Sequence, residues 1–152
     1  MNKTKLKYIS RIIPIGYLLH LLDEYFVGNG FASWFSEMMK VDLSSTDFII
    51  INSFGLAAVV LIVILYNLGK LKEFFIAALG VLFFINGIVH ITASLLSFSY
   101  SPGTFTSFVF YLPIGFIVIK NFFPLLPEQQ RILSLITGVA VQIIVAVVAL
   151  TI

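Results

Sequence analysis

Five long apolar stretches constrain this chain more than any other feature of its sequence. They cover residues 12–27, 48–66, 74–97, 104–119 and 132–152. Each is close to the ~20 residues that a helix needs to cross a bilayer. None shows the two-residue alternation of a membrane barrel strand. The sequence therefore predicts an all-α polytopic membrane protein, with residues 1–152 forming a single five-helix transmembrane domain.

The composition excludes several other classes of protein. Charged residues make up 11 % of the chain and hydrophobic residues 60 %, whereas a soluble domain carries about 25 % charged residues. A water-soluble globule, a disordered chain and a nucleic-acid-binding protein do not fit this balance. The chain has no cysteine, which excludes disulfides and thiol-ligated metal or redox sites.

The connections between the stretches contain turn and cap residues. Residues 31–39 mix Trp, Phe and Met with polar residues, so we expect a short interfacial segment on the bilayer surface between the first two spans. Ser44 is a candidate cap for the second span. Residues 99–103 end in Pro-Gly, which favours a turn. Pro124 and Pro127 follow the fourth span and should end it.

The basic residues predict an orientation in the membrane. If five helices alternate in direction, only Lys40 lies on the second side of the bilayer. The other side then carries Lys3, Lys5, Lys7, Arg11, Lys70, Lys72, Lys120 and Arg131. Because Lys and Arg are retained on the cytoplasmic side, we expect a plasma-membrane protein with a cytoplasmic N-terminus and an external C-terminus.

The first span carries three ionisable residues: His20, Asp23 and Glu24. Each such group costs about 2.5–3.5 kcal/mol at the centre of a membrane helix, so it persists where it faces a protected interior with partners. At about 100° per residue, Glu24 lies about 40° from His20, and Asp23 about 60° to its other side. Tyr17 falls on the same face. This polar stripe is predicted to point into the bundle.

A second polar stripe lies on the third span, where Asn86 and His90 share a helix face. At 1.5 Å per residue, His20 lies about 12 Å from the cytoplasmic end of its span, Glu24 and Asn86 about 18 Å, and His90 about 24 Å. The two stripes therefore reach similar depths, and we expect them to meet across a shared hollow. Other polar residues at the external ends of neighbouring spans are Asn52, Thr106 and Ser107.

Three sequence blocks resemble those of the HXXEE-domain family of small membrane proteins. The signature block is residues 20–24, His-Leu-Leu-Asp-Glu, in which Asp23 stands for the first Glu. The second is Asn86 to His90, and the third is Tyr100 to Ser107 followed by Leu-Pro. The basic residue often found before the third block is absent, because Phe and Ser stand there. This resemblance implies a functional site at these blocks and leaves its reaction open.

A second likeness is architectural and concerns sterol isomerases of the emopamil-binding type. These enzymes are similar in having five membrane helices and a His and a Glu four residues apart inside the bundle. The analogy is compatible with proton transfer to a lipid-soluble substrate, but a shared architecture does not by itself imply a shared activity.

Acid–base chemistry is the first of three functions that such a cluster could perform. Asp23 or Glu24 would exchange a proton with a lipid-soluble substrate, His20 and His90 would relay it, and Asn86 would orient the substrate. Isomerisation or cyclisation of an isoprenoid or sterol-like lipid fits this chemistry. Further candidate substrate-binding residues are Tyr17, Asn52, Tyr100, Thr106 and Ser107.

The other two functions are metal chemistry and binding without catalysis. His20, Glu24 and His90 could hold a divalent metal, Zn or Fe, in a membrane hydrolase or oxidase. Without catalysis, the same pocket could bind a membrane lipid, another hydrophobic small molecule or a small cation. It could also pass protons as a transport subunit, for which so short a chain would need a homo-oligomer. The alternative to all three functions is that the cluster is a structural polar network that fixes helix packing. Gln142, a lone amide in the last span, is expected to form an interhelical hydrogen bond.

Overall fold

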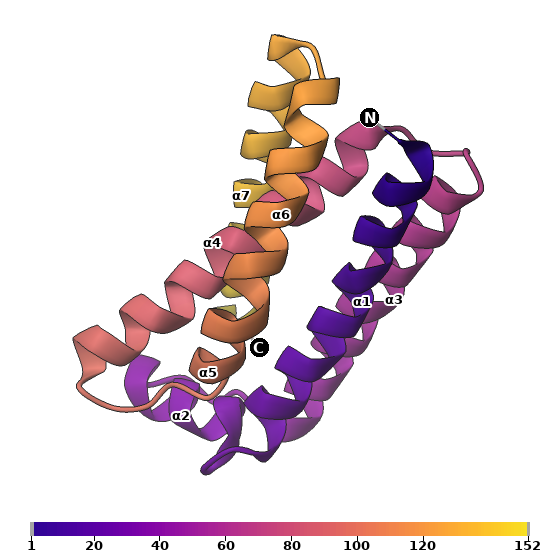
Figure 1. Cartoon of the computed structure of the whole chain (residues 1–152). Helices are drawn as coiled ribbons and strands as arrows, with labels where there is room; N and C mark the ends of the chain where they lie inside the picture. The colour runs from indigo at the N-terminus through magenta and orange to yellow at the C-terminus, as the bar shows by residue number, and fades with distance from the viewer. Residues whose placement is uncertain (1, 152) are drawn as a thin grey trace.

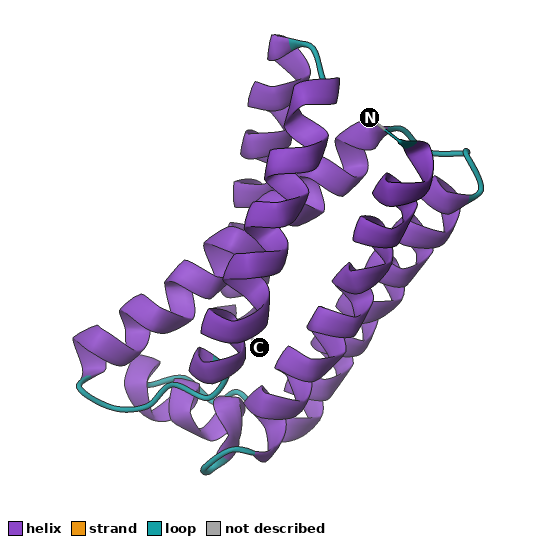
Figure 2. Cartoon of the chain, viewed as in Figure 1, coloured by secondary structure: helices purple, strands orange, loops and turns teal. Residues whose placement is uncertain are grey.

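The computed structural model describes residues 2–151, and this part of the chain is helical with no strand (Figure 2). Five long helical segments and one short helix account for most of it. In chain order the elements are α1 (Lys3–Phe26), α2 (Gly30–Met39), α3 (Ser45–Asn67), α4 (Glu73–Ser97), α5 (Thr104–Thr106), η1 (Ser107–Tyr111), α6 (Leu112–Phe122), η2 (Phe123–Leu125) and α7 (Glu128–Thr151).

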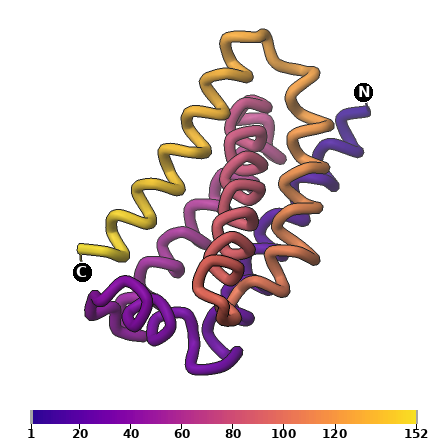
Figure 3. The backbone as a smooth tube through the Cα atoms, turned by 90° about the vertical axis from the view of Figure 1, so that its left-hand side faces the viewer, coloured from indigo at the N-terminus to yellow at the C-terminus, as the bar shows by residue number. Residues whose placement is uncertain are grey.

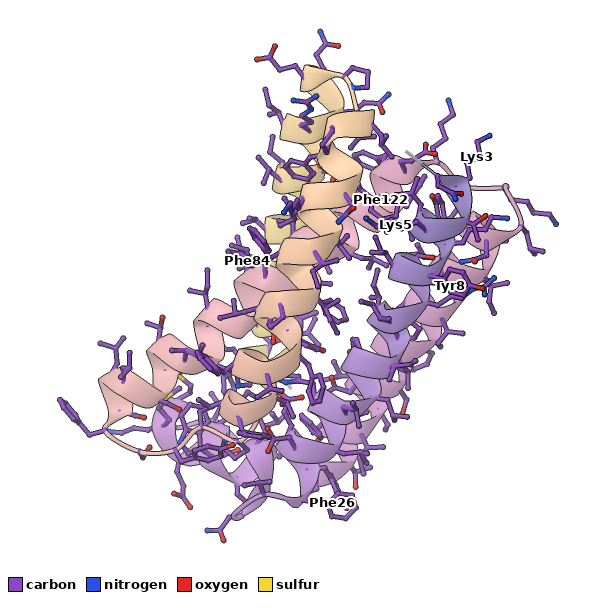
Figure 4. All side chains as sticks on the ribbon, in the orientation of Figure 1. Lys3, Lys5, Tyr8, Phe26, Phe84 and Phe122 are labelled. Carbon is purple, nitrogen blue, oxygen red and sulfur yellow. The ribbon has the colours of Figure 1, made fainter. Side chains whose placement is uncertain are left out.

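The long segments alternate in direction (Figures 1 and 3). α1 pairs with α3, whereas α4 packs against both α6 and α7. The N-terminus and the α3–α4 and α6–α7 connections lie at one end of the molecule, and α2 and the α4–α5 loop lie at the other. Lys3 and Lys5 mark the first end, and the exposed Phe26 marks the second (Figure 4).

Four of the five predicted spans are long and apolar enough to cross a membrane. They are α3, α4, the segment Thr104–Leu125 and α7. α1 is as long as these helices, but it carries basic residues in its first turns and Asp23 and Glu24 near its end, so it is not one of the four. By length and composition the prediction of five spans is therefore reduced to four.

Two predicted boundaries also change. α1 begins at Lys3 rather than near residue 12, because the Asn2 side chain accepts a hydrogen bond from Thr4 N and caps the helix. The fourth span is a composite of α5, η1 and α6, with a π-helical turn at Ser107–Tyr111. Pro113 is the second residue of α6. Because proline has no N–H to donate to the preceding turn, it favours a local departure from α-helical hydrogen bonding such as this π-helical turn.

The apolar core lies between α1, α3, α4 and α6, and Ile13, Ile76, Val118 and Phe122 are fully buried in it. α4 and α6 approach closely because glycines face each other: a Cβ on Gly115 would come within 2.8 Å of the Gly80 carbonyl oxygen. Small residues permit such contact between membrane helices. This packing fixes α4 against α6, and α6 in turn contacts α1.

α2 closes the end of the bundle opposite the N-terminus. Residues 31–39, predicted as an interfacial segment, all lie within this helix. Its buried Ala32 packs in a small cluster with Leu43 and Phe48, next to Phe31 and Phe35. The following helix, α3, is capped by Ser44 as predicted, since its side chain accepts a hydrogen bond from Asp47 N.

Candidate functional site

His20, Glu24 and His90 form one buried cluster between α1 and α4. Glu24 Oε1 lies 3.2 Å from His90 Nε2 and 3.6 Å from His20 Nε2. The three residues are only 2 %, 6 % and 4 % exposed. The two imidazole rings meet edge to face, with their centroids 4.8 Å apart. The expectation that the two stripes meet across a shared hollow is thus confirmed for these three side chains.

The tautomer of His20 follows from a chain of hydrogen bonds. Thr106 Oγ1 lies 2.8 Å from His20 Nδ1 and 2.7 Å from Asp23 Oδ2, to which it donates. A hydroxyl has one proton, so when it donates to the carboxylate it must accept from the imidazole. His20 then carries its proton on Nδ1. Its Nε2 atom keeps a lone pair, and this atom is buried without a hydrogen-bond partner.

His90 is oriented in a similar way by the α4–α5 loop. Its Nδ1 atom lies 3.3 Å from Ser101 Oγ, which donates to Pro102 O at 3.4 Å. With Nδ1 protonated, the ring donates to Ser101 and turns the Nε2 lone pair toward Glu24; with Nε2 protonated, it donates to Glu24 Oε1, which lies 3.2 Å away. Ser101 is held in place by Ser94, whose Oγ accepts from Ser101 N at 2.7 Å.

The outcome is a convergence of three acceptor atoms. One atom from each of His20, Glu24 and His90 lies within 4.8 Å of the other two. When both imidazole protons are on the outer nitrogens, the two Nε2 lone pairs face the carboxylate oxygen of Glu24. Lone pairs directed at one point repel each other unless a positive charge lies between them. In that protonation state the three atoms could hold a cation between them.

Asp23 lies outside this convergence, although it belongs to the same sequence block. Its Oδ2 atom accepts from Thr106 N at 3.0 Å as well as from the Thr106 hydroxyl, and its Oδ1 atom accepts from Tyr100 OH at 3.4 Å. Partial burial raises the pKa of Tyr100 in the loop, so this phenol stays protonated as a donor at neutral pH. Asp23 thus connects α1 to the α4–α5 loop through Tyr100 and to α5 through Thr106, the residue that orients His20.

Gly103 forms a wall of the cluster, which the sequence analysis treated only as a turn position. Its φ of 94° lies in the left-handed region, where glycine is favoured. A Cβ at Gly103 would come within 2.9 Å of Glu24 Cγ, His20 Cε1 and His90 Cε1. The signal for this role was present in the sequence, since Gly103 belongs to the third family block.

Tyr111 is a further residue that the sequence analysis missed. Its ring stacks on His20, with centroids 3.9 Å apart, and it contacts Phe83 on its other side at 4.2 Å. It comes from the π-helical turn within a Phe-rich segment. Nothing in the sequence distinguished it from the neighbouring lipid-facing aromatic residues.

A cavity of about 160 Å³ opens from the cluster. Its polar lining residues include Tyr17 and Asn52, joined by a hydrogen bond of 3.2 Å, and Asn86 and Gln142, joined by another of 3.2 Å. The predicted interhelical hydrogen bond of Gln142 is thus confirmed. Among the apolar lining residues are Phe31, Trp34, Phe35, Leu43, Phe48, Ile51, Phe83, Val145 and Ala149.

Four of the candidate residues do not line this cavity: Asp23, Tyr100, Thr106 and Ser107. Asp23, Tyr100 and Thr106 form the hydrogen-bonded layer behind His20. Ser107 is fully buried, and its hydroxyl has no hydrogen-bond partner. Asn86 lines the cavity one helical turn from His90, where it contacts Gln142.

Comparison with known proteins places these residues in a family. The model of a family described as "protein of unknown function with HXXEE motif" matches residues 11–118. No curated protein and no solved structure matches the chain significantly. The matched range holds the His20–Glu24 block, the Asn86–His90 block and the loop with Gly103. Because the match covers more than half of the chain, the protein belongs to the HXXEE family.

Proposed function

We propose that this protein is a membrane metalloenzyme in which His20, Glu24 and His90 hold one divalent cation, Zn or Fe. The observation that carries the proposal is that two imidazole Nε2 atoms and a carboxylate oxygen converge. The other nitrogen of each ring, Nδ1, contacts the hydroxyl of Thr106 or Ser101. In a tetrahedral zinc site with bonds of about 2.0–2.1 Å, neighbouring ligand atoms lie roughly 3.3 Å apart. The two distances from Glu24, 3.2 and 3.6 Å, are close to that spacing, and all three ligand atoms lie within 4.8 Å of one another.

The ligand set also supports a catalytic rather than a purely structural metal. Structural zinc sites are closed by four protein ligands, whereas catalytic sites use three and leave a position open. Two His and one carboxylate are also the facial ligand set of non-haem Fe(II) oxygenases. When bound, such a metal activates water or oxygen, or polarises a carbonyl. His20 and His90 both line the cavity, so a hydrolase or oxidase acting on a lipid-soluble substrate is the proposed activity.

The protein residues around the cluster have defined parts in this proposal. The chain from His20 through Thr106 to Asp23 fixes the imidazole in the tautomer that offers Nε2, which is the usual role of groups behind a metal-binding His. Tyr111 stacks on His20, and Gly103 closes one side of the cluster. Apolar walls allow a hydrophobic substrate to reach it.

We further propose that α1 is a fifth membrane-spanning helix. It runs antiparallel to α3 along the length of the molecule (Figure 1). Its acidic residues are buried against other helices rather than facing outward. With Lys and Arg kept on the cytoplasmic side, the N-terminus would be cytoplasmic and the C-terminus external in the plasma membrane. This orientation sets the cluster in the external half of the bilayer.

Acid–base chemistry on a lipid, such as isomerisation or cyclisation, is the second candidate. One observation favours it: the Asp23–Thr106–His20 chain leaves a lone pair on His20 Nε2, and a neutral imidazole with a free nitrogen is also a competent general base. The two candidates differ in whether activity requires a metal.

Metal content of the purified protein tests the proposal. We expect about one Zn or Fe per chain in wild type and less than about 0.1 in Glu24→Gln, since metal sites need their deprotonated ligands. Glu37→Gln is the matched control, because Glu37 is exposed on α2; it should keep the wild-type content. A wild type that stays below about 0.1 metal per chain after loading with either ion would overturn the proposal and leave acid–base chemistry.

A further inference from the structure

The cavity has a second polar end, formed by Asn86 of α4 and Gln142 of α7. Asn86 Nδ2 donates to Gln142 Oε1 at 3.2 Å, and Asn86 Oδ1 is buried without a partner. Asn86 Oδ1 and the Gln142 amide nitrogen have no protein partner, and both residues line the cavity, so the pair lacks one donor and one acceptor that a ligand could supply. If both side-chain amides are turned over, the pair still presents one donor and one acceptor. It is complementary to a ligand group that both donates and accepts.

The distance between the two polar ends is set by α4. Asn86 and His90 lie four residues apart on one helix face, which separates them by about 6 Å along the axis. Both residues line the same cavity. If the polar group of a ligand binds the amide pair, the part of the ligand roughly 6 Å from that group would therefore lie at the His20–Glu24–His90 cluster.

The remaining lining excludes a charged headgroup. Glu24 is the one charged residue among those that line the cavity, and no Lys or Arg contributes to it. An anionic lipid headgroup would lose its hydration there without a basic side chain to compensate. The other walls are mainly aromatic and aliphatic. The lining is therefore suited to an uncharged amphiphile.

The size of the cavity and its borders indicate how such a molecule would enter. About 160 Å³ accommodates a molecule little larger than benzene, so a lipid chain must extend outside. α3 contributes Ile51 and α7 contributes Val145 to the lining, yet these two helices make no extensive contact with each other. Val145 is also 40 % exposed. The border between α3 and α7 is therefore the path along which an acyl or isoprenoid chain can reach the bilayer.

We infer that the substrate is an uncharged lipid bearing a hydroxyl or amide group, which Asn86 and Gln142 bind while the lipid chain leaves between α3 and α7. This inference rests on the proposed function, because it takes the His20–Glu24–His90 cluster as the reacting end. Asn86 is a positioning and specificity residue here, since it contacts the ligand about one helical turn from the metal ligands.

Quenching of the single tryptophan provides the test. Trp34 is the one Trp of the chain and lines the cavity, so a brominated lipid in the cavity quenches its fluorescence. The probes are brominated stearyl alcohol, brominated methyl stearate, which accepts but does not donate, and brominated stearyl phosphate, which is anionic. We expect saturable quenching in detergent, with the alcohol bound about tenfold more tightly than the ester. The ester cannot donate a hydrogen bond, so it leaves the buried Asn86 acceptor unpaired. The phosphate should bind more weakly than both.

Two variants assign the preference to the amide pair. Asn86→Leu should remove the tenfold difference between alcohol and ester, whereas Gln129→Leu, an exposed glutamine in the first turns of α7, should keep it. Equal binding of alcohol and ester by wild type, tighter binding of the phosphate, or an unchanged preference in Asn86→Leu would overturn the inference. Metal content is measured on the same preparations. A bound metal with no alcohol preference rejects this inference alone, and an alcohol preference without metal rejects the metal proposal alone.

Discussion

Thr106 donates both its backbone N–H and its hydroxyl to the same carboxylate oxygen of Asp23, at 3.0 and 2.7 Å. These two bonds tie the start of the fourth span to α1. The same hydroxyl accepts from His20, so the loop connection and the orientation of the imidazole depend on one side chain. Asp23 therefore influences the cluster although it does not enter it.

Thr106→Val removes this shared hydroxyl while keeping the shape of the side chain. Loss of a group behind a metal-binding His typically lowers metal affinity by about 10–100-fold, and we expect this range here. The backbone N–H of residue 106 would still bond to Asp23, which limits the structural damage. Metal affinity is measured by competition with a chelator. Thr106→Ser, which restores the hydroxyl, should return to within about threefold of wild type, and a Ser variant as weak as Val would contradict the relay.

Ser107→Ala tests the opposite situation, a buried hydroxyl without a partner. Removing an unsatisfied polar group relieves its desolvation cost of about 1–3 kcal/mol. Part of this gain is offset by the small void that is left. We therefore expect a thermal midpoint equal to or above that of wild type in the same detergent, with metal content unchanged. A drop of several degrees would show that the hydroxyl has a partner that matters for stability.

Gly103→Ala should damage the site beyond the cost of its backbone conformation. A left-handed non-glycine residue costs about 1–2 kcal/mol, and the added Cβ would also press on Glu24, His20 and His90. Gly69→Ala is the matched control, because Gly69 has a φ of 74° with nothing within 4 Å of the new Cβ. Both variants should lose stability in thermal unfolding, and Gly103→Ala should lose more because only its Cβ overlaps other side chains. Only Gly103→Ala should lose metal, and equal metal content in the two would show that the wall has no influence on the cluster.

The absence of cysteine from the chain permits a direct test of the five-span topology. Single cysteines introduced as Lys3→Cys, Lys70→Cys and Lys40→Cys are labelled in intact cells with a membrane-impermeant maleimide. If α1 spans the membrane, Lys40→Cys should be labelled from outside, and the other two only after lysis. Labelling of Lys3→Cys and Lys40→Cys from the same side would mean that α1 does not cross the bilayer.

Helical periodicity explains why part of the cluster could be predicted from the sequence. His20 and Glu24 are one turn apart on α1, and Asn86 and His90 are one turn apart on α4. Residues at this spacing share a face in any α-helix. Membrane burial of ionisable groups requires such faces to point inward. These two rules predict that both pairs point into the bundle, where His20 and Glu24 can meet His90.

Other relationships depend on packing between segments far apart in sequence. Asp23 and Glu24 are adjacent acids, but one bonds to Thr106 and the other faces His90. That difference arises because the α4–α5 loop folds back onto α1, which no local pattern encodes. Tyr111, at the end of the π-helical turn, stacks on His20, which lies more than 90 positions earlier in the chain. Local spacing sets which side chains share a helix face, whereas the identity of the facing partner depends on how neighbouring helices and loops pack against that face.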